Sequence, residues 1–328
     1  MKRALFSIFF LIISVSAARA ELKTVVSIKP IHSLVAAMMV GTKHSPDVLI
    51  DGTASPHGYA LKPSQVALLD RAELVVWIAP ELESFLKKPL QTVAKDASII
   101  TLMDAKGLTI HAASDHHDHG DHGDHGEEHH DEHADEHHGE EHHDEHADEH
   151  HGEANAMGND PHIWLDPENA ARMVDALHER LVALDPKNAT LYQVNKDKLQ
   201  QRLSALDTEV RAMLTPLKSH NYMVFHNAYS YFTRHYGLQD AGVISNNPEV
   251  QPSVAEVNKA KDYFHDHKIN CVFVEPQFPK NRIEAVRENH HAKVGTLDPL
   301  GAALPAGPEL YFSLIRNLAQ SMQNCLEV

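Results

Sequence analysis

The sequence contains few cysteines and no long apolar run beyond its first twenty residues. Cys271 and Cys325 are its only cysteines among 328 residues, so it can form at most one internal disulfide. No segment after residue 20 approaches the roughly 18 apolar residues that a membrane-spanning helix needs. The chain is therefore expected to be soluble once its first twenty residues are removed.

The sequence also lacks any concentration of basic residues. It has 29 Lys and Arg against 46 Asp and Glu, a formal charge of −17 at pH 7. Without a basic patch or a basic helix to neutralise phosphates, nucleic acid is excluded as a partner. The residues from 115 to 153 alone include 17 Asp and Glu and no Lys or Arg. The rest of the chain is therefore electrically balanced, and the acidity belongs to one segment.

The first twenty residues are typical of a secretory signal peptide. Lys2 and Arg3 precede an apolar run from Ala4 to Ala18, and the small-x-small sequence at residues 18–20 predicts cleavage before Glu21. A membrane anchor is the alternative, but the run is short for a span. We therefore expect residues 1–20 to be a signal peptide and the mature protein to lie outside the cytoplasm.

Export to an oxidising compartment affects the expected state of the two cysteines. They could be buried free thiols, but export favours a disulfide between Cys271 and Cys325. Such a bond closes a loop of about 55 residues and contributes roughly 4 kcal/mol in the chain-entropy model. Its expected role is to fasten the C-terminal helix to a core strand.

Short apolar runs alternate with helical patterns through the chain, and the alternation restarts after residue 220. This is typical of mostly parallel sheets covered by helices, so we predict an α/β fold with two lobes, residues 21–187 and 218–328. The strand-like runs lie at residues 24–28, 48–50, 74–78 and 98–101, and then at 222–225, 241–244, 269–274 and 293–297.

A long helix is predicted over residues 188–217. This stretch contains no Gly, its one Pro is Pro216, and apolar residues recur at spacings of three to five. At 1.5 Å per residue the helix would be about 40 Å long and would link the lobes rigidly. The alternative is a helix that belongs to one lobe.

The residues from 115 to 153 form a low-complexity insertion in the first lobe, in which the thirteen residues 127–139 recur unchanged at 140–152. It has no aromatic or branched apolar residue to bury, so we expect it to be disordered. Its imidazoles should bind borderline metals such as Zn²⁺ weakly at several places, although a merely solvated acidic linker is the alternative. It contains no His-Glu-x-x-His protease motif. The histidines are His116, His117, His119, His122, His125, His129, His130, His133, His137, His138, His142, His143, His146, His150 and His151.

Three other histidines stand out by their context. His57 lies in Ser-Pro-His-Gly-Tyr, His162 in Asp-Pro-His-Ile-Trp-Leu-Asp-Pro and His226 in Phe-His-Asn-Ala-Tyr. Each follows a strand-like run or lies in a Pro-bounded turn, where α/β folds place ligands. Taken singly, each would be an ordinary surface or hydrogen-bonded histidine, and spacing alone does not join them into one site.

These three segments, together with Leu297-Asp298-Pro299-Leu300, resemble the motifs of the metal-binding proteins of cluster A-I ABC importers, and most closely those of the zinc-uptake members. The match spans nearly the whole mature chain, including the His-rich insertion and the late cysteine pair. It implies two (β/α)₄-type lobes with central parallel sheets, joined by a long rigid helix, with the metal between them. It also implies a monomeric periplasmic protein that captures Zn²⁺ and delivers it to an inner-membrane ABC permease with its cytoplasmic ATPase.

The resemblance also implies a ligand set. His57 and His162 would come from the first lobe and His226 from the second, with Asp298 near the fourth position, a tetrahedral set that suits Zn²⁺. Manganese-importing relatives tend to carry a carboxylate at the position of His226, so the imidazole there favours zinc.

The residue before the first histidine departs from the pattern. Some zinc-uptake relatives carry a glutamate there, whereas this chain has Pro56. The fourth ligand is therefore either Asp298 or a water molecule. Glu275 is a weaker candidate, and we expect it to support a ligand, since ligating imidazoles usually donate their other N–H to a carboxylate or carbonyl.

Three further interpretations remain open. The same architecture could carry Mn²⁺ or Fe²⁺, or the protein could be an extracellular zinc buffer in which the His-rich insertion binds the metal. A zinc hydrolase also uses three histidines and an open position. These motifs offer no convincing general base for one, so we do not expect an enzyme.

Overall fold

The computed structural model describes residues 21–113, 158–245, 247–287 and 292–327. The predicted signal peptide and the predicted His-rich insertion lie outside these ranges. Within them, no helix is both long and apolar enough to cross a membrane.

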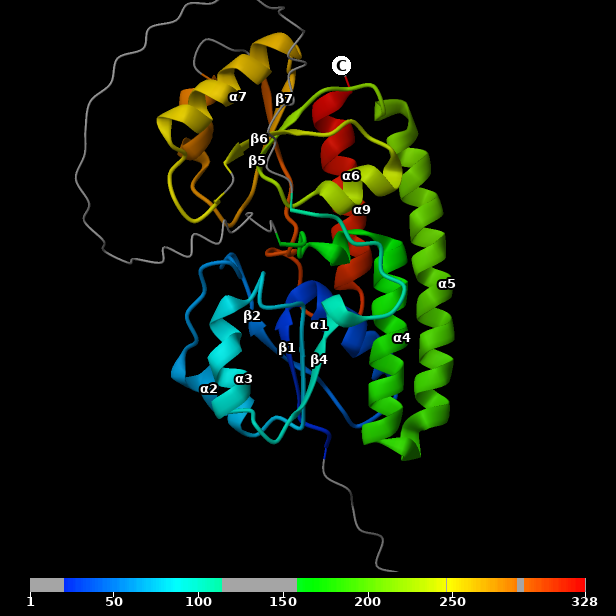
Figure 1. Ribbon diagram of the computed structural model, residues 1–328. Coiled ribbons are helices and arrows are strands. Elements are labelled where there is room, and N and C mark those ends of the chain that lie inside the picture. Colours follow the sequence, from blue (N-terminus) through cyan, green and yellow to red (C-terminus); the bar gives the residue numbers. More distant parts are fainter. Residues whose placement is uncertain (1–20, 114–157, 246, 288–291, 328) are drawn as a thin grey trace, which may run out of the picture.

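The first lobe is a parallel four-stranded sheet with helices packed around it (Figure 1). Its strand order is β2-β1-β3-β4. The central strands are buried along their whole length, as expected for parallel strands covered on both faces. The elements are β1 (Thr24–Ile28), α1 (Lys29–Met38), β2 (Asp47–Ile50), α2 (Pro63–Asp70), β3 (Leu74–Trp77), η1 (Ser84–Leu86), α3 (Lys87–Thr92), β4 (Ser98–Thr101) and η2 (Leu102–Asp104).

The second lobe repeats the same topology. Its sheet has the order β6-β5-β7-β8, again with parallel pairs throughout, so β5 corresponds to β1 and β7 to β3. The elements are β5 (Met223–His226), α6 (Ser230–Tyr236), β6 (Gly242–Ser245), α7 (Val254–Asp266), β7 (Cys271–Val274), η6 (Lys280–Ile283), α8 (Glu284–Arg287) and β8 (Lys293–Thr296).

Three long helices form a layer beside the lobes (Figure 1). Asp166 caps the first of them, its carboxylate accepting the N–H of Glu168. The predicted linking helix is confirmed as α5 with a 3₁₀ turn at either end, and the predicted fold class is confirmed with it. The elements are η3 (Ile163–Leu165), α4 (Pro167–Leu184), η4 (Pro186–Asn188), α5 (Ala189–Leu214), η5 (Thr215–Leu217) and α9 (Leu310–Leu326).

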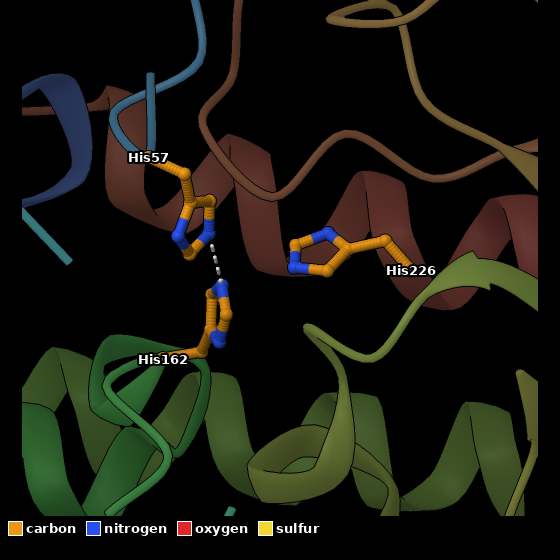
Figure 2. A group of neighbouring side chains, drawn as sticks. All are labelled: His57, His162 and His226. Atoms are coloured by element: carbon orange, nitrogen blue, oxygen red, sulfur yellow. Dashed lines mark hydrogen bonds between the residues drawn. The ribbon is translucent and has the colours of Figure 1, made fainter. Parts of the chain in front are cut away.

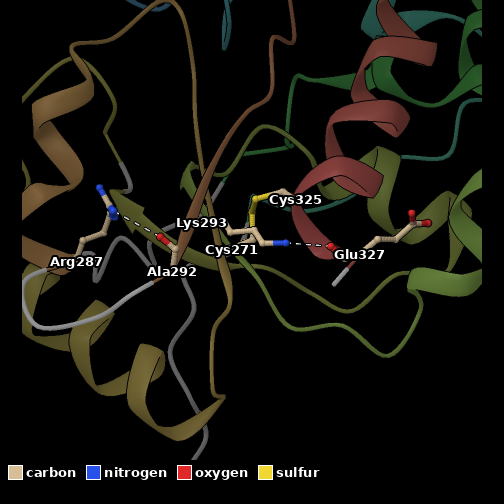
Figure 3. Close-up of a disulfide and its surroundings, with 6 residues drawn as sticks. All are labelled: Cys271, Arg287, Ala292, Lys293, Cys325 and Glu327. Carbon is tan, nitrogen blue, oxygen red and sulfur yellow. Dashed lines mark hydrogen bonds between the residues drawn. A yellow bond between two sulfur atoms is a disulfide. The ribbon is translucent and has the colours of Figure 1, made fainter.

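The C-terminal helix α9 ties the second lobe to the rest of the protein. It packs against α1 and α5, and one hydrophobic core runs from the first sheet through α4, α5 and α9 to Tyr222 and Phe273 of the second lobe. The predicted disulfide is confirmed: Cys271 of β7 is bonded to Cys325 of α9, with a Cα–Cα distance of 5.9 Å (Figure 3). The outer part of the second lobe has its own smaller core, which includes Met223 and Phe225.

Candidate metal centre

Three histidines from distant parts of the chain meet between the lobes (Figure 2). His57 lies in the turn that follows β2, His162 directly precedes η3, and His226 is the last residue of β5. Their rings point toward one another, with ring centroids 5.1–5.3 Å apart. The fold thus brings together the three residues that the sequence singled out.

The distances between the ring nitrogens suit a metal ion. The Nε2 atoms of His57 and His162 are 3.3 Å apart, and one nitrogen from each of the three rings lies within 4.8 Å of the others. Two nitrogens bound to Zn²⁺ at about 2.0–2.1 Å with tetrahedral angles would be roughly 3.3–3.4 Å apart. The pair of imidazoles from the first lobe is therefore already spaced as a tetrahedral edge.

Asp160 fixes the ring of His162. The carboxylate Oδ1 accepts hydrogen bonds from Nδ1 of His162, at 2.7 Å, and from the backbone N–H of the same residue, at 3.0 Å. Both side chains are buried. Because the carboxylate binds the protonated Nδ1, the lone pair of Nε2 is left facing the other histidines.

Asp160 also reaches the second lobe. Its Oδ2 accepts the hydroxyl of Ser230, at the start of α6, and its backbone carbonyl accepts the hydroxyl of Tyr231. The sequence analysis missed this residue as part of the site. The available signal was an aspartate two residues before a histidine, a spacing at which the carboxylate can accept the N–H of that histidine.

Glu275 has the same role for His226. It directly follows β7, is 2% exposed, and its Oε1 lies 3.2 Å from Nδ1 of His226. This is the supporting contact expected from the sequence, and it again leaves Nε2 free to bind a metal.

His57 is held differently. Within the part of the chain that the structure describes, neither ring nitrogen of His57 meets a carboxylate, and its backbone N–H donates to Ser55 Oγ at 3.3 Å. Burial, followed by the proximity of His162 and His226, holds the pKa of His57 well below its usual value. Its imidazole is therefore neutral at pH 7, the form that binds a metal.

The group of side chains that could hold a metal consists of the three histidines and does not include Asp298. Its Oδ1 accepts the N–H groups of Leu300 and Gly301 and the side-chain amide of Gln277, and its Oδ2 accepts the N–H of Ala302 at 2.6 Å. These four donors hold the carboxylate in the turn that follows β8.

The pocket around the histidines is small. Its cavity volume is ≈ 10 Å³, close to the 10–15 Å³ that one water molecule needs. Among the described residues, no second group of three or more His, Cys, Asp or Glu could hold a metal ion. The lining consists of Ser55, Pro56, His57, His162, Trp164, His226, Glu275, Gln277, Phe278, Pro299 and Leu300.

Comparison with known proteins gives consistent matches over most of the chain. The family described as "Zinc-uptake complex component A periplasmic" matches residues 24–325. High-affinity zinc uptake system protein ZnuA of Brucella abortus (strain 2308) is 40% identical over 317 residues, covering 92% of this chain and 91% of that protein. The ZnuA of Yersinia pestis is 36% identical over 308 residues, with 94% and 92% covered.

Solved structures show the same likeness. A crystal structure of ZnuA matches with a TM-score of 0.72 and 26% identity, covering 94% of this chain and 100% of that one. A deletion mutant of ZnuA with zinc bound also has a TM-score of 0.72 and 26% identity, with 94% and 99% covered.

Proposed function

The chain belongs to the family of the periplasmic component A of zinc-uptake complexes, and from this we propose that it captures Zn²⁺ with high affinity for an ABC-type zinc importer. The partners would be an inner-membrane permease and its cytoplasmic ATPase, the protein itself acting in the periplasm as a monomer after removal of residues 1–20. The observation that carries the proposal is the convergence of three imidazoles from two lobes on one small pocket.

The donor set favours zinc over manganese or iron. The proposed ligands are Nε2 of His57, His162 and His226, with a water molecule in the fourth position, a combination that suits Zn²⁺. Manganese prefers carboxylate, carbonyl and water oxygens. The carboxylates of Asp160 and Glu275 bind the far nitrogens of two of the histidines instead.

The same engagement of the carboxylates disfavours a hydrolase. A zinc hydrolase needs a general base within hydrogen-bond reach of the metal-bound water. Asp160 is held by His162 and Ser230, and Glu275 by His226. The site therefore supports binding and release rather than proton transfer.

We assign an auxiliary role to the His-rich insertion, residues 115–153. Its fifteen histidines would scavenge zinc at low affinity and pass it to the site between the lobes when zinc is scarce. This role rests on composition and on the position of the insertion between the motifs of His57 and His162.

Zinc titration against a competing chelator tests the proposal. The protein would be the mature chain without residues 115–153, as such and with His226→Ala. His265→Ala is the matched control, because that side chain is 84% exposed and lies on α7, away from the pocket. We expect one tight equivalent of zinc in the parent and the control, and a loss of at least about a hundredfold in affinity in His226→Ala, since even partners behind the ligands contribute tenfold to a hundredfold.

Each result is decisive. Absence of a tight equivalent, or one indifferent to His226→Ala, would make the His-rich insertion the binding element and favour the buffer interpretation. If the parent protein binds Mn²⁺ in preference to Zn²⁺, manganese is the transported metal. Unchanged growth under chelation of a strain that lacks residues 115–153 would remove the scavenging role alone.

A further inference from the structure

A buried acceptor without a partner lies beside the histidines. Gln277 lines the same pocket. Its Oε1 is buried and, within the described residues, accepts no hydrogen bond. Buried carbonyl oxygens are nearly always paired, so an orphaned one beside a metal site indicates a bound water or ion as its partner.

The fold determines which end of the Gln277 amide lacks a hydrogen-bond partner. Nε2 of Gln277 donates to Oδ1 of Asp298 at 2.9 Å. A carboxylate can only accept, so the amide cannot be flipped without losing this bond. Oε1 is therefore the free end.

A tight turn places Gln277 beside Glu275. The N–H of Phe278 donates to the carbonyl of Glu275 at 3.3 Å, and Pro276 lies at the second position of this turn, where its fixed φ is favoured. Glu275, Gln277 and Phe278 then all line the pocket. One turn after β7 thus supplies both the carboxylate behind His226 and the orphaned amide oxygen.

We propose that Gln277 is the positioning residue for the fourth zinc ligand, its Oε1 accepting a hydrogen bond from a water molecule bound to the metal. Water is the chemical choice, because zinc sites with three protein ligands characteristically complete their tetrahedron with water. The inference rests on the zinc-binding function proposed above.

Asp298 then acts on the metal site indirectly, through Gln277. Its carboxylate receives Nε2–H of Gln277 and the three backbone N–H groups of the turn at residues 300–302. It thereby orients the amide of Gln277 and holds the turn that places Pro299 and Leu300 in the pocket wall.

The test uses the mature full-length chain and the variants Gln277→Leu, Asp298→Asn and the two combined. Gln239→Leu is the matched control, since the Gln239 side chain donates to the carbonyl of Lys218, outside the pocket. Three readouts are needed: zinc affinity by chelator competition, the number and type of ligands by X-ray absorption of the zinc-loaded protein, and thermal unfolding of the metal-free protein.

We expect Gln277→Leu to lower the zinc affinity about tenfold, at the lower end of the effect of partners behind metal ligands. The metal-free unfolding temperature should stay near that of the parent, and Gln239→Leu should bind zinc like the parent. X-ray absorption of the parent should show three imidazoles and one oxygen. Because Asp298 would act through Gln277, the double variant should lose less affinity than the product of the two single losses.

Parental zinc affinity in Gln277→Leu overturns the inference, as does a zinc site with no oxygen ligand. A carboxylate ligand that disappears in Asp298→Asn overturns it in favour of direct ligation by Asp298. In each case a tight site that requires His226 would leave the proposed function standing. A parent without a tight site would instead refute the function itself.

Discussion

The two lobes share one sheet topology and place a buried glutamate after the same strand, but they use it for different purposes. Glu83 follows β3 and is 0% exposed, and its Oε2 accepts the N–H groups of Ile78 and Ala79, at 2.9 and 3.1 Å. Glu275 follows β7, is 2% exposed, and binds the ring of His226. In the first lobe the carboxylate therefore supports the backbone, and in the second it supports a proposed zinc ligand.

This difference shows how each lobe provides its ligands. The second lobe carries His226 on a strand end, so a carboxylate from the neighbouring strand suffices to orient it. The first lobe supplies His57 and His162 from loops, outside its sheet. It therefore takes its orienting carboxylate, Asp160, from the loop of His162 itself, and secures that loop to α6 through Ser230.

The lobes also differ in how they are attached to the helical layer. The first sheet shares one continuous core with α4, α5 and α9, whereas the outer part of the second lobe has a small core of its own. The disulfide between Cys271 and Cys325 joins the second sheet to α9. It should therefore matter most for the second lobe.

The largest effect is expected from removing this disulfide with Cys271→Ser and Cys325→Ser together. The bond closes a loop with a sequence separation of 54, for which the chain-entropy model gives about 4 kcal/mol of unfolding free energy. Denaturant unfolding of the metal-free protein measures the loss. Hydrogen exchange should show the strands of the second sheet losing protection before those of the first. Equal loss in both lobes would contradict the difference in attachment.

The second largest effect, on the free energy of unfolding, is expected at Glu83. Burial raises its pKa from 4.5 to about 7, so between these values the folded protein binds more protons than the unfolded chain. Stability contributed at this site is therefore lost as the pH rises through that window, by about 3 kcal/mol. Glu83→Gln, which keeps an acceptor for both N–H groups, should be more stable than the parent at pH 8 by this amount and lose its advantage at pH 4.5.

Urea unfolding at the two pH values, with chelator present, checks this prediction. Glu81→Gln is the matched control, because Glu81 is exposed and only two residues away. An advantage of Glu83→Gln that does not change with pH would show that the carboxylate is not the cause.

A smaller effect is expected at the two orienting carboxylates. Asp160→Asn and Glu275→Gln should each lower the zinc affinity between tenfold and a hundredfold, the usual range for a partner behind a ligating imidazole. The loss should be greater in Asp160→Asn, because Asp160 also binds Ser230 and so secures α6. Chelator competition measures both.

Asp185→Asn is the matched control for this pair. Asp185 also binds a partly buried histidine, with 2.9 Å between its Oδ2 and Nε2 of His44, but outside the pocket. A loss of zinc affinity in the control as large as that in Asp160→Asn would indicate a general effect on the fold. A greater loss of zinc affinity in Glu275→Gln than in Asp160→Asn would contradict the predicted order of the two effects.

The sequence predicted the fold and the three histidines but not the groups that orient them. Alternation of strands and helices, the long helix and the disulfide follow from local periodicity and compartment, which are properties of the chain itself. The grouping of His57, His162 and His226 followed only from the resemblance between motifs. To predict the role of Asp160 would have required knowledge of the turn that brings its carboxylate back onto His162.

The surroundings of Asp298 could not be predicted for a related reason. A carboxylate in a ligand-bearing motif suggested a ligand, but its direction is determined by four donors, three of them backbone N–H groups of a turn. No pattern of residue types reveals that competition. The orphaned Oε1 of Gln277 is hidden from the sequence in the same way, because it depends on which end of the amide Asp298 binds.

The smallest effect is the pH dependence of zinc binding. Imidazoles must be neutral to bind the metal, so affinity falls as protons compete. The pKa of His57 is lowered by burial beside His162 and His226, so this ring stays neutral below the usual value of about 6.5. With residues 115–153 removed, we expect little change between pH 7.5 and 6.5 and a loss of about tenfold by pH 5, measured by chelator competition. His57→Ala should bind more weakly at every pH. Equal affinity at pH 5 and 7.5 would contradict a site built from three imidazoles.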